Sequence, residues 1–158
     1  MLDETDLRLL DALQRDAQMS TQALGERVNL SASQVGRRRQ RLEAAGYIRG
    51  YGARLDENRL GLQVQAFVQV QMASHEAAQV ASFARRIDTL PEITGAWILS
   101  GEADYLLHIY CRSLTDLNRL IQNEILPLKA VARVQSQIVM DQRKYDGPLP
   151  VRCAVAAS

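Results

Sequence analysis

The first 45 residues carry apolar side chains at the three- and four-residue intervals that are typical of amphipathic helices. A first helix is expected over residues 3–16, because Asp3 can cap it and leucines recur along one face at near-helical spacing. A second, shorter helix starts at Ser20. It ends at Asn29, a residue type that tolerates the left-handed conformation found at helix ends.

A third helix begins at the capping box Ser31–Gln34 and runs to about Ala45, where Gly46 ends it. Only a tight turn separates it from the second helix. Residues 47–55 alternate loosely and contain glycines, which predicts a short extended segment or wing, and residues 56–62 are expected to be a linker. Two short helices joined by a tight turn are typical of a helix-turn-helix, whose second helix enters the major groove of DNA.

Beyond residue 62 the apolar period changes to two, the spacing of strands with one buried face. In chain order we expect a strand over residues 63–72, a helix capped by Ser74 with an apolar stripe of Ala77, Val80, Ala81, Ala84 and Ile87, strands over residues 93–99 and 103–112, a helix that Ser113 caps and Pro127 ends, and a strand over residues 131–140. This β-α-β-β-α-β order is the ferredoxin-like plan. The predicted fold class is therefore α+β, with a helix-turn-helix before a ferredoxin-like βαββαβ domain.

Composition adds limits to this picture. A chain of 158 residues with 47% hydrophobic content can form one ordinary packed domain or two small ones, and each of two small domains would gain from association with another copy. No apolar run approaches the roughly 20 residues that cross a bilayer, and the first residues do not resemble a signal peptide. Two distant cysteines favour a reducing compartment. We therefore expect a cytoplasmic protein without membrane contact, and two distant histidines predict no metal site and no cofactor.

Charge is unevenly distributed along the chain, although the net charge is only +1. Residues 1–26 carry two arginines against six acidic residues, a net charge of −4, whereas residues 27–54 carry seven arginines against one glutamate, a net charge of +6. A local excess of this size attracts phosphate even on a nearly neutral chain. The positive stretch includes the third predicted helix, so the charge falls where a recognition helix is expected.

The exposed face of the third helix supplies candidate DNA contacts. At 100° per residue, Val35 and Leu42 define its buried face, beside a polar arc of about 100°. The candidate DNA-binding residues are Ser33, Gln34, Arg37, Arg38 and Arg41. Glutamine can pair with adenine, and arginine with guanine or phosphate. An arginine run can also be a solvated helix face, but this one coincides with Gly25, Asn29 and Val35, the small, turn and apolar residues that a helix-turn-helix needs.

Short motifs recur in a fixed order along residues 1 to about 145. They are Leu2-Asp3, Asp6, Leu9-Leu10 and Leu13-Gln14, then Leu30-Ser31, Arg38, Arg41-Leu42-Glu43 and Gly46-Tyr47-Ile48, then Gly50-Tyr51, Ala53, Leu55-Asp56 and Leu60-Gly61, and finally Ser100-Gly101-Glu102-Ala103-Asp104-Tyr105. Together they resemble the Lrp/AsnC (feast/famine) family of transcription regulators. The resemblance implies a winged helix-turn-helix DNA-binding domain over residues 1–55, a linker over 56–62, an effector-binding and oligomerisation domain over 63–145, and a tail over 146–158.

The same resemblance implies a sequence-specific DNA-binding transcription regulator, not an enzyme, whose DNA binding or oligomeric state responds to a small amino-acid effector. Its partners would be double-stranded DNA, the effector, and further copies of the chain, as dimers that assemble to octamers. His108 and Tyr110 share one strand face and are expected at a subunit contact. Arg39 stands where the family has an apolar residue, so its stem is expected to be buried while its guanidinium reaches phosphate.

The loop from Ser100 to Asp104 is the candidate effector site. Gly101 permits close approach of the backbone, and the Asp104 carboxylate can bind the ammonium group of an amino acid. The resemblance implies that the last strand also lines the site, through Gln135 and Ser136. The alternative is that Gly101 only makes a hairpin turn and that Asp104 caps it.

Two other functions remain open from the sequence. A nucleoid-type architectural protein would use the same helix-turn-helix to compact DNA without sensing a ligand. Some relatives that are similar in both domains act as sirohaem decarboxylases, and such an enzyme has no need of an arginine-rich third helix. Colour or tetrapyrrole binding would identify the enzyme, and a flat thermal-shift response to all amino acids, with intact DNA binding, would identify the architectural protein.

Overall fold

The computed structural model describes residues 1–145 and 147–151. The chain divides into two compact units: an N-terminal unit of Met1–Arg54 with the residues from Lys144 onward, and a sheet unit of Leu55–Arg143. No helix among the described residues is long and apolar enough to cross a membrane. Of the predicted tail, residue 146 and residues 152–158 lie outside the described residues.

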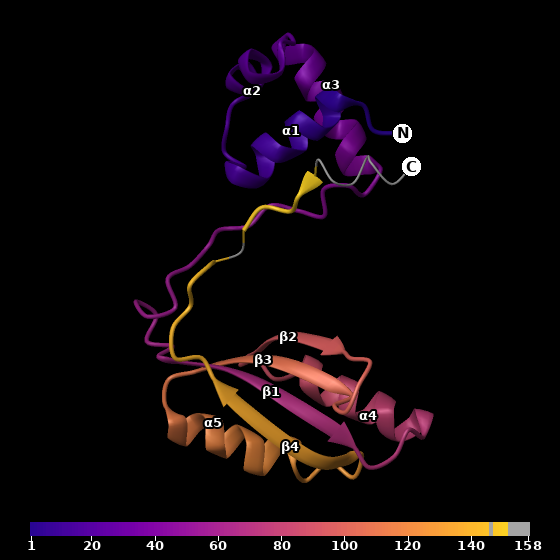
Figure 1. The fold of residues 1–158 in the computed structure, drawn as a ribbon, viewed down its shortest axis with the longest axis vertical. Helices are drawn as coiled ribbons and strands as arrows, with labels where there is room; N and C mark the ends of the chain where they lie inside the picture. The colour runs from indigo at the N-terminus through magenta and orange to yellow at the C-terminus, as the bar shows by residue number, and fades with distance from the viewer. Residues whose placement is uncertain (146, 152–158) are drawn as a thin grey trace. The chain divides into compact units, whose positions relative to one another are not determined.

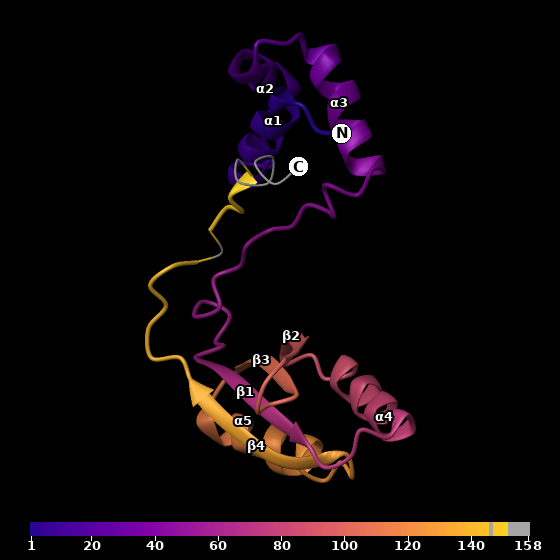
Figure 2. The same ribbon diagram turned by 45° about the vertical axis from the view of Figure 1, so that its right-hand side comes forward.

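The N-terminal unit contains the three helices that the sequence predicts (Figure 2): α1 (Glu4–Arg15), α2 (Thr21–Val28) and α3 (Ala32–Ala44). Each starts at its predicted N-cap, because the side chains of Asp3, Ser20 and Ser31 each accept a hydrogen bond from the backbone N–H three residues on. The three helices meet in a core of Leu9, Ala12, Leu13, Leu24, Val28, Val35 and Leu42. In so small a unit, burial of these side chains is the main source of stability.

The connection between α2 and α3 has the geometry of a helix-turn-helix. Asn29 ends α2 in the left-handed conformation, with φ of 56°. A Cβ atom on Gly25 would lie 2.4 Å from the Leu30 carbonyl oxygen, so only glycine allows the chain to pass this closely. Val35 is fully buried. The roles predicted for Gly25, Asn29 and Val35 are confirmed.

Residues 47–55, expected as a short extended segment or wing, contain neither helix nor strand. In the part of the chain that the structure describes, the first strand begins at Val64. A lone extended segment gains no ladder of hydrogen bonds, and Gly50 and Gly52 carry no side chains to bury. Within residues 56–62, expected as a linker, the chain turns so that the Leu62 N–H donates to the Glu57 carbonyl at 2.9 Å.

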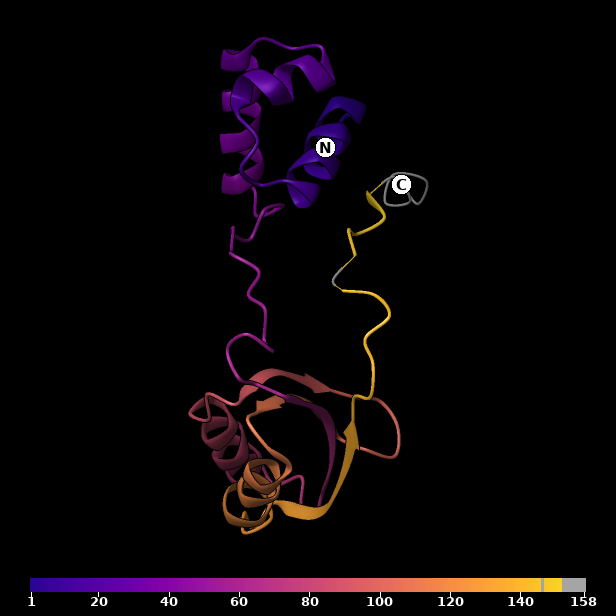
Figure 3. The same ribbon diagram turned by 90° about the vertical axis from the view of Figure 1, so that its left-hand side faces the viewer.

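The sheet unit follows the predicted order: β1 (Val64–Met72), α4 (Ala77–Asp88), β2 (Ile93–Ile98), β3 (Tyr105–Cys111), α5 (Leu114–Leu120) and β4 (Val131–Ile138). The sheet order β2-β3-β1-β4, with every neighbouring pair antiparallel, is the ferredoxin-like arrangement. Helices α4 and α5 lie on the same side of the sheet (Figures 1 and 3). The other side, which we call the open face, is covered by no helix of this unit among the described residues.

Side chains of the strands alternate between these two faces. The helix-covered face contains a single core: Ala66, Val68, Val70 and Met72 from β1, Tyr105, Leu107, Ile109 and Cys111 from β3, and Phe83, Ile87, Leu117, Leu120 and Ile125 from the helical segments. Burial, followed by the nearby carboxylates of Glu92 and Asp116, raises the pKa of the Cys111 thiol. The thiol therefore stays protonated and packs as a small apolar group.

Two predictions for α4 need correction. The helix begins at Ala77 after an N-cap, Glu76, whose side chain makes no capping hydrogen bond, and the Ser74 hydroxyl accepts only from the Glu76 N–H at 3.2 Å. The predicted apolar stripe omitted Phe83, which is fully buried, and included Ala77 and Ala81, which are exposed. An aromatic ring buries far more apolar area than an alanine methyl group, so Phe83 fixes which face of α4 turns inward.

The helix after Ser113 is not a regular α-helix throughout, and the tail contacts the N-terminal unit. Helix α5 continues as a π-helical turn, η1 (Ile121–Ile125), and the helical region ends before Pro127, as predicted. In the N-terminal unit, the Gln14 side-chain amide donates to the Leu149 carbonyl at 2.9 Å and accepts from the Leu149 N–H at 2.8 Å. The tail residue is therefore bonded to α1 through its backbone.

Candidate nucleic-acid interface and effector site

The start of α3 holds two of the predicted DNA contacts in its capping box. The Gln34 side-chain oxygen accepts a hydrogen bond from the Ser31 backbone N–H at 2.9 Å, and the Ser33 hydroxyl lies 3.1 Å from the Ser31 hydroxyl. Both side chains are exposed. Gln34 therefore stabilises the helix start in the free protein, and a base contact would have to use its amide N–H groups or break the cap.

Arg38 and Arg41 converge on a carboxylate that is fully buried, Asp6 of α1. Arg38 Nη1 lies 2.7 Å from Asp6 Oδ1 and 2.6 Å from Asp3 Oδ2, while Arg41 Nη2 lies 2.5 Å from Asp6 Oδ2. The hydrogen bond from Arg38 lowers the pKa of Asp3, and the carboxylates of Asp3 and Asp6 raise the pKa of Arg38. These contacts bind α3 to α1. Arg38 is 29% exposed and Arg41 is 56% exposed, so Arg41 keeps the larger surface for another partner.

Arg39 forms a second cluster on α3, with Glu43 and Tyr51. Its Nε atom donates to Glu43 and to the Tyr51 hydroxyl, both at 3.0 Å, and its guanidinium lies 4.6 Å from the centre of the Tyr51 ring. The Tyr51 hydroxyl donates to Glu43 at 2.7 Å. Burial raises the pKa of Tyr51, and the Tyr51 hydrogen bond lowers the pKa of Glu43. The predicted burial of the Arg39 stem is consistent with its 28% exposure, but the guanidinium binds protein groups.

Arg37 differs from these neighbours. Its side chain is exposed, and among residues 1–145 and 147–151 its guanidinium has no hydrogen-bond or ion-pair partner. Gln40, one turn after Arg37 on the same exposed side, is a polar residue that the arc around Gln34 did not include. A helical-wheel projection of the sequence could have identified Gln40, because Ser33, Arg37 and Gln40 point almost directly away from Val35.

In the sheet unit, Asp104 anchors the loop between β2 and β3. Its Oδ2 atom accepts from the Met72 N–H at 2.7 Å, and its Oδ1 atom lies 3.7 Å from His75 Nε2. Its backbone N–H donates to the Val70 carbonyl at 3.0 Å. Gly101 is exposed with φ of 151°, so the loop needs glycine there. These contacts match the alternative in which Asp104 secures a turn.

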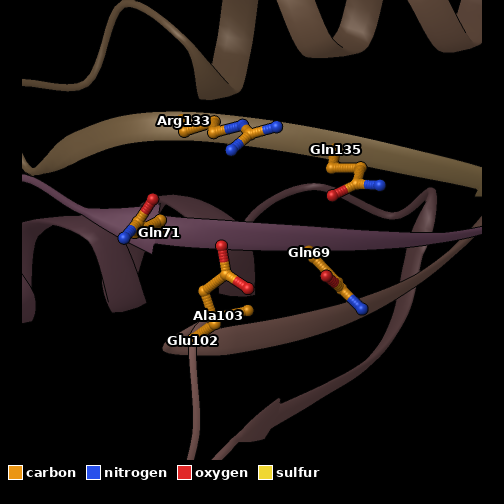
Figure 4. Close-up of a pocket in the computed structure, with 6 residues that line it drawn as sticks. All are labelled: Gln69, Gln71, Glu102, Ala103, Arg133 and Gln135. Carbon is orange, nitrogen blue, oxygen red and sulfur yellow. The ribbon is translucent and has the colours of Figure 1, made fainter.

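A small polar hollow lies beside this loop on the open face (Figure 4). Its lining residues are Gln69, Gln71, Glu102, Ala103, Arg133 and Gln135. The Glu102 carboxylate is directed toward β1, and Arg133 comes from β4 on the other side of β1. The volume of about 40 Å³ holds water but is far below the roughly 300–1,000 Å³ of small-molecule sites. The hollow of a single chain is therefore too small to enclose an amino acid.

The two candidates on β4 do not face the same way. Gln135 pairs with Gln69 on the open face and lines the hollow, whereas Ser136 pairs with Val68 and belongs to the opposite, helix-covered face. Neighbouring residues of a strand point to opposite sides, so one copy of the sheet cannot bring Gln135 and Ser136 into one hollow. Glu102 and Arg133 were not predicted as site residues. The sequence offered one signal, because Gln69 and Gln71 alternate with the apolar residues of β1 and so mark a polar strand face.

The rest of the open face is polar and aromatic. The rings of Phe67 and His108 stack at 4.6 Å, and Gln65 Nε2 lies 2.7 Å from His108 Nε2 and 3.0 Å from the Tyr110 hydroxyl. Trp97 is 48% exposed, and a Cβ atom on Gly95 would lie 2.5 Å from its ring. Partly exposed aromatic rings on a sheet without a helix above it are typical of a surface that another protein covers.

The chain combines a helix-turn-helix, whose recognition helix α3 is rich in arginine, with a separate α+β unit that carries a polar hollow. This combination is typical of transcription regulators that have a DNA-binding domain and a ligand-binding domain in one chain. Residues 2–43 match the AsnC-type helix-turn-helix domain and residues 65–149 match the Lrp/AsnC ligand binding domain. The chain belongs to the Lrp/AsnC family.

Relatives along the whole chain agree with this assignment. The chain is 33% identical over 151 residues to the DNA-binding transcriptional activator DecR of Escherichia coli, covering 96% of this chain and 99% of the relative. It is 34% identical over 143 residues to the leucine-responsive regulatory protein of Rhizobium meliloti, covering 90% and 92%. A transcriptional regulator of Neisseria meningitidis, crystallised with L-Met, superposes with a TM-score of 0.93 at 31% identity, over 98% of this chain and 99% of that one.

Proposed function

We propose that the chain is a cytoplasmic, sequence-specific DNA-binding transcription regulator whose DNA binding or oligomeric state responds to a small amino acid. The observation that carries the proposal is the exposed guanidinium of Arg37, which has no partner among the described residues and lies on the outward side of α3 beside Ser33 and Gln40. Arg37 is proposed to read base edges or phosphate, Arg41 to contact phosphate with the N–H groups that Asp6 leaves available, and Arg38 mainly to hold α3 in place. Ser33 and Gln34 are proposed as contacts at the start of the helix.

Selection of a preferred duplex from a random DNA library with the full chain tests the DNA-binding proposal. Binding should be sequence-selective and should weaken steeply with salt, because arginine–phosphate contacts release counterions. Adding each amino acid in turn should change the affinity for the selected duplex, or the mass of the protein in solution, for at least one of them. Binding without any sequence preference would instead identify an architectural protein.

The hollow beside the β2–β3 loop supports the amino-acid part of the proposal. Glu102 can bind an ammonium group and Arg133 a carboxylate, so the pair matches the two charges common to all amino acids. Ser100, Gly101 and Asp104 are proposed to shape the loop around the ligand, and Gln135 to line the site. The volume of about 40 Å³ supports a site that a second copy of the chain completes.

Arg133→Ala and Glu102→Gln are expected to abolish the thermal stabilisation that an amino acid gives, while the ligand-free unfolding temperature stays unchanged. At 100 times its Kd, a ligand that binds only the folded state adds about 2.7 kcal/mol, which differential scanning fluorimetry detects. Asp104→Ala should also lower the ligand-free unfolding temperature, because the Met72 N–H loses its acceptor. Arg85→Ala, an exposed arginine of α4, is the matched control. A full response in both hollow variants would contradict this site.

The open face supports self-association, and we propose that two copies pair through it. Phe67, His108 and Trp97 lie on this face, and the core of the unit is already complete beneath the opposite face. A dimer presents two copies of α3, as half-sites on DNA require, and dimers are proposed to assemble further, to octamers.

Phe67→Asp is expected to reduce the mass of the protein in solution from that of an oligomer toward that of a monomer. It places a charge in the centre of the open face, where a partner would have to desolvate it. Light scattering measures the mass, and Ser82→Asp on the exposed side of α4 adds the same charge away from this face. An unchanged mass for Phe67→Asp would exclude the open face as the interface.

A further inference from the structure

Gly36 lies within α3, and the described part of the chain gives no structural reason for a glycine there. Its φ is not among the positive values found at Gly46, Gly61 and Gly101, so no special backbone conformation requires it. Apart from its chain neighbours and the nearby backbone of α3 itself, a Cβ atom built on Gly36 would meet no atom of the described residues within 4 Å. Gly25, by contrast, is needed to avoid the Leu30 carbonyl. Glycine weakens a helix interior more than any residue except proline, so α3 is less stable than it would be with alanine at this position.

Polar groups that can bind DNA lie beside Gly36 on the surface of α3. On a helix surface, a residue lies next to those three and four positions before and after it. For Gly36 these are Ala32, Ser33, Arg39 and Gln40. The Arg39 guanidinium already binds protein groups, so the DNA-binding candidates beside Gly36 are Ser33, Gln40 and the next residue, Arg37. All three side chains are exposed. Ser33, Arg37 and Gln40 therefore place hydrogen-bonding groups beside the bare helix backbone at Gly36.

We infer that Gly36 is the point at which base edges of the major groove approach the backbone of α3. The inference rests on the proposed DNA-binding function. Glycine allows a ligand to approach the backbone closely, and short side chains such as Ser33 reach a base edge only if the helix lies deep in the groove. Arginines reach phosphates on long stems and need no such approach. Gly36 is thus a specificity-determining residue, because it sets how deeply α3 enters the groove.

A side chain at Gly36 should therefore separate stability from recognition. Gly36→Ala and Gly36→Leu are expected to raise the unfolding temperature of the full chain, since both residues favour helix over glycine. The same variants should bind the selected duplex more weakly at about 0.15 M salt. The expected loss for alanine is at least about tenfold, the range of one mismatched base pair, and leucine should lose more. Affinity for a scrambled duplex should stay unchanged, because phosphate contacts provide it.

The control is Ser82→Ala, which places an alanine on an exposed helix position of the sheet unit and should leave both affinities unchanged. If Gly36→Ala binds the selected duplex as tightly as the unsubstituted chain, the inference is overturned while the proposed function stands. A lowered unfolding temperature in Gly36→Ala would also overturn it, because glycine would then serve the fold. If the unsubstituted chain prefers no duplex, the proposed function fails, and the inference fails with it.

Discussion

Asp6→Ala is expected to destabilise the N-terminal unit by about 3 kcal/mol, the lower end of the range for breaking a buried ion pair. The Asp6 carboxylate is fully buried and receives hydrogen bonds from Arg38, Arg41 and the Asp3 backbone N–H. Its removal leaves Arg38 near α1 with only Asp3 as a partner. The cost is at the lower end because both guanidiniums remain accessible to water. Asp6→Asn keeps a side-chain oxygen that can accept from the Asp3 N–H, so it should destabilise the unit less than Asp6→Ala.

Amide hydrogen exchange measures this effect unit by unit in the intact chain. Protection should fall in α1 and α3 and stay unchanged in β1 and β3, since the described hydrogen-bond partners of Asp6 belong to the N-terminal unit. Glu4→Ala is the matched control, because it removes the carboxylate of an exposed pair with Arg8 and should change protection too little to resolve. Unchanged protection of α3 in Asp6→Ala would mean that the ion pairs contribute nothing to holding the two helices together.

The helix-turn-helix could be predicted from the sequence because its signals are local. Caps at Asp3, Ser20 and Ser31 and the turn residue Asn29 act within a few residues, and the structure has each where the sequence predicts it. The ion pairs of Arg38 and Arg41 could not be predicted this way. A helical wheel gives a side chain's direction on its own helix but not what the neighbouring helix presents 32 residues away. One signal existed, because Asp6 lies on the same helix stripe as Leu9 and Leu13.

The ferredoxin-like order of the sheet unit could also be predicted, but its site depends on register. Gln69 and Gln135 become neighbours only when β1 pairs with β4, and no local pattern fixes that pairing. Glu102 joins them because Asp104 fastens the loop to the end of β1 at Met72. That Gln135 and Ser136 face opposite sides of the sheet, by contrast, follows from the two-residue period of a strand and could have been predicted from the sequence.

Arg37→Ala is expected to weaken binding of the selected duplex by about 30-fold to 10⁴-fold. Removal of one arginine that pairs with a base typically costs about 1–3 kcal/mol, and a dimer would be affected in both half-sites. The fold should be unaffected, because Arg37 is exposed and makes no ion pair within the described residues. Arg85→Ala removes an exposed charge from the sheet unit and should leave affinity unchanged. Fluorescence anisotropy with the selected and a scrambled duplex measures both.

The two duplexes and the salt dependence together decide what Arg37 does. If Arg37 reads a base, its removal weakens the selected duplex far more than the scrambled one and leaves the salt slope nearly unchanged. If it binds phosphate, both duplexes weaken alike and the slope falls by about 1 for each phosphate that is no longer neutralised. Arg38→Ala shows what a folding effect would look like, because it should lower the amide-exchange protection of α3 together with the affinity for DNA. If Arg37→Ala and the unsubstituted chain bind DNA with equal affinity, the outward side of α3 is excluded as the DNA-binding surface, since Arg37 is the most available cation on it.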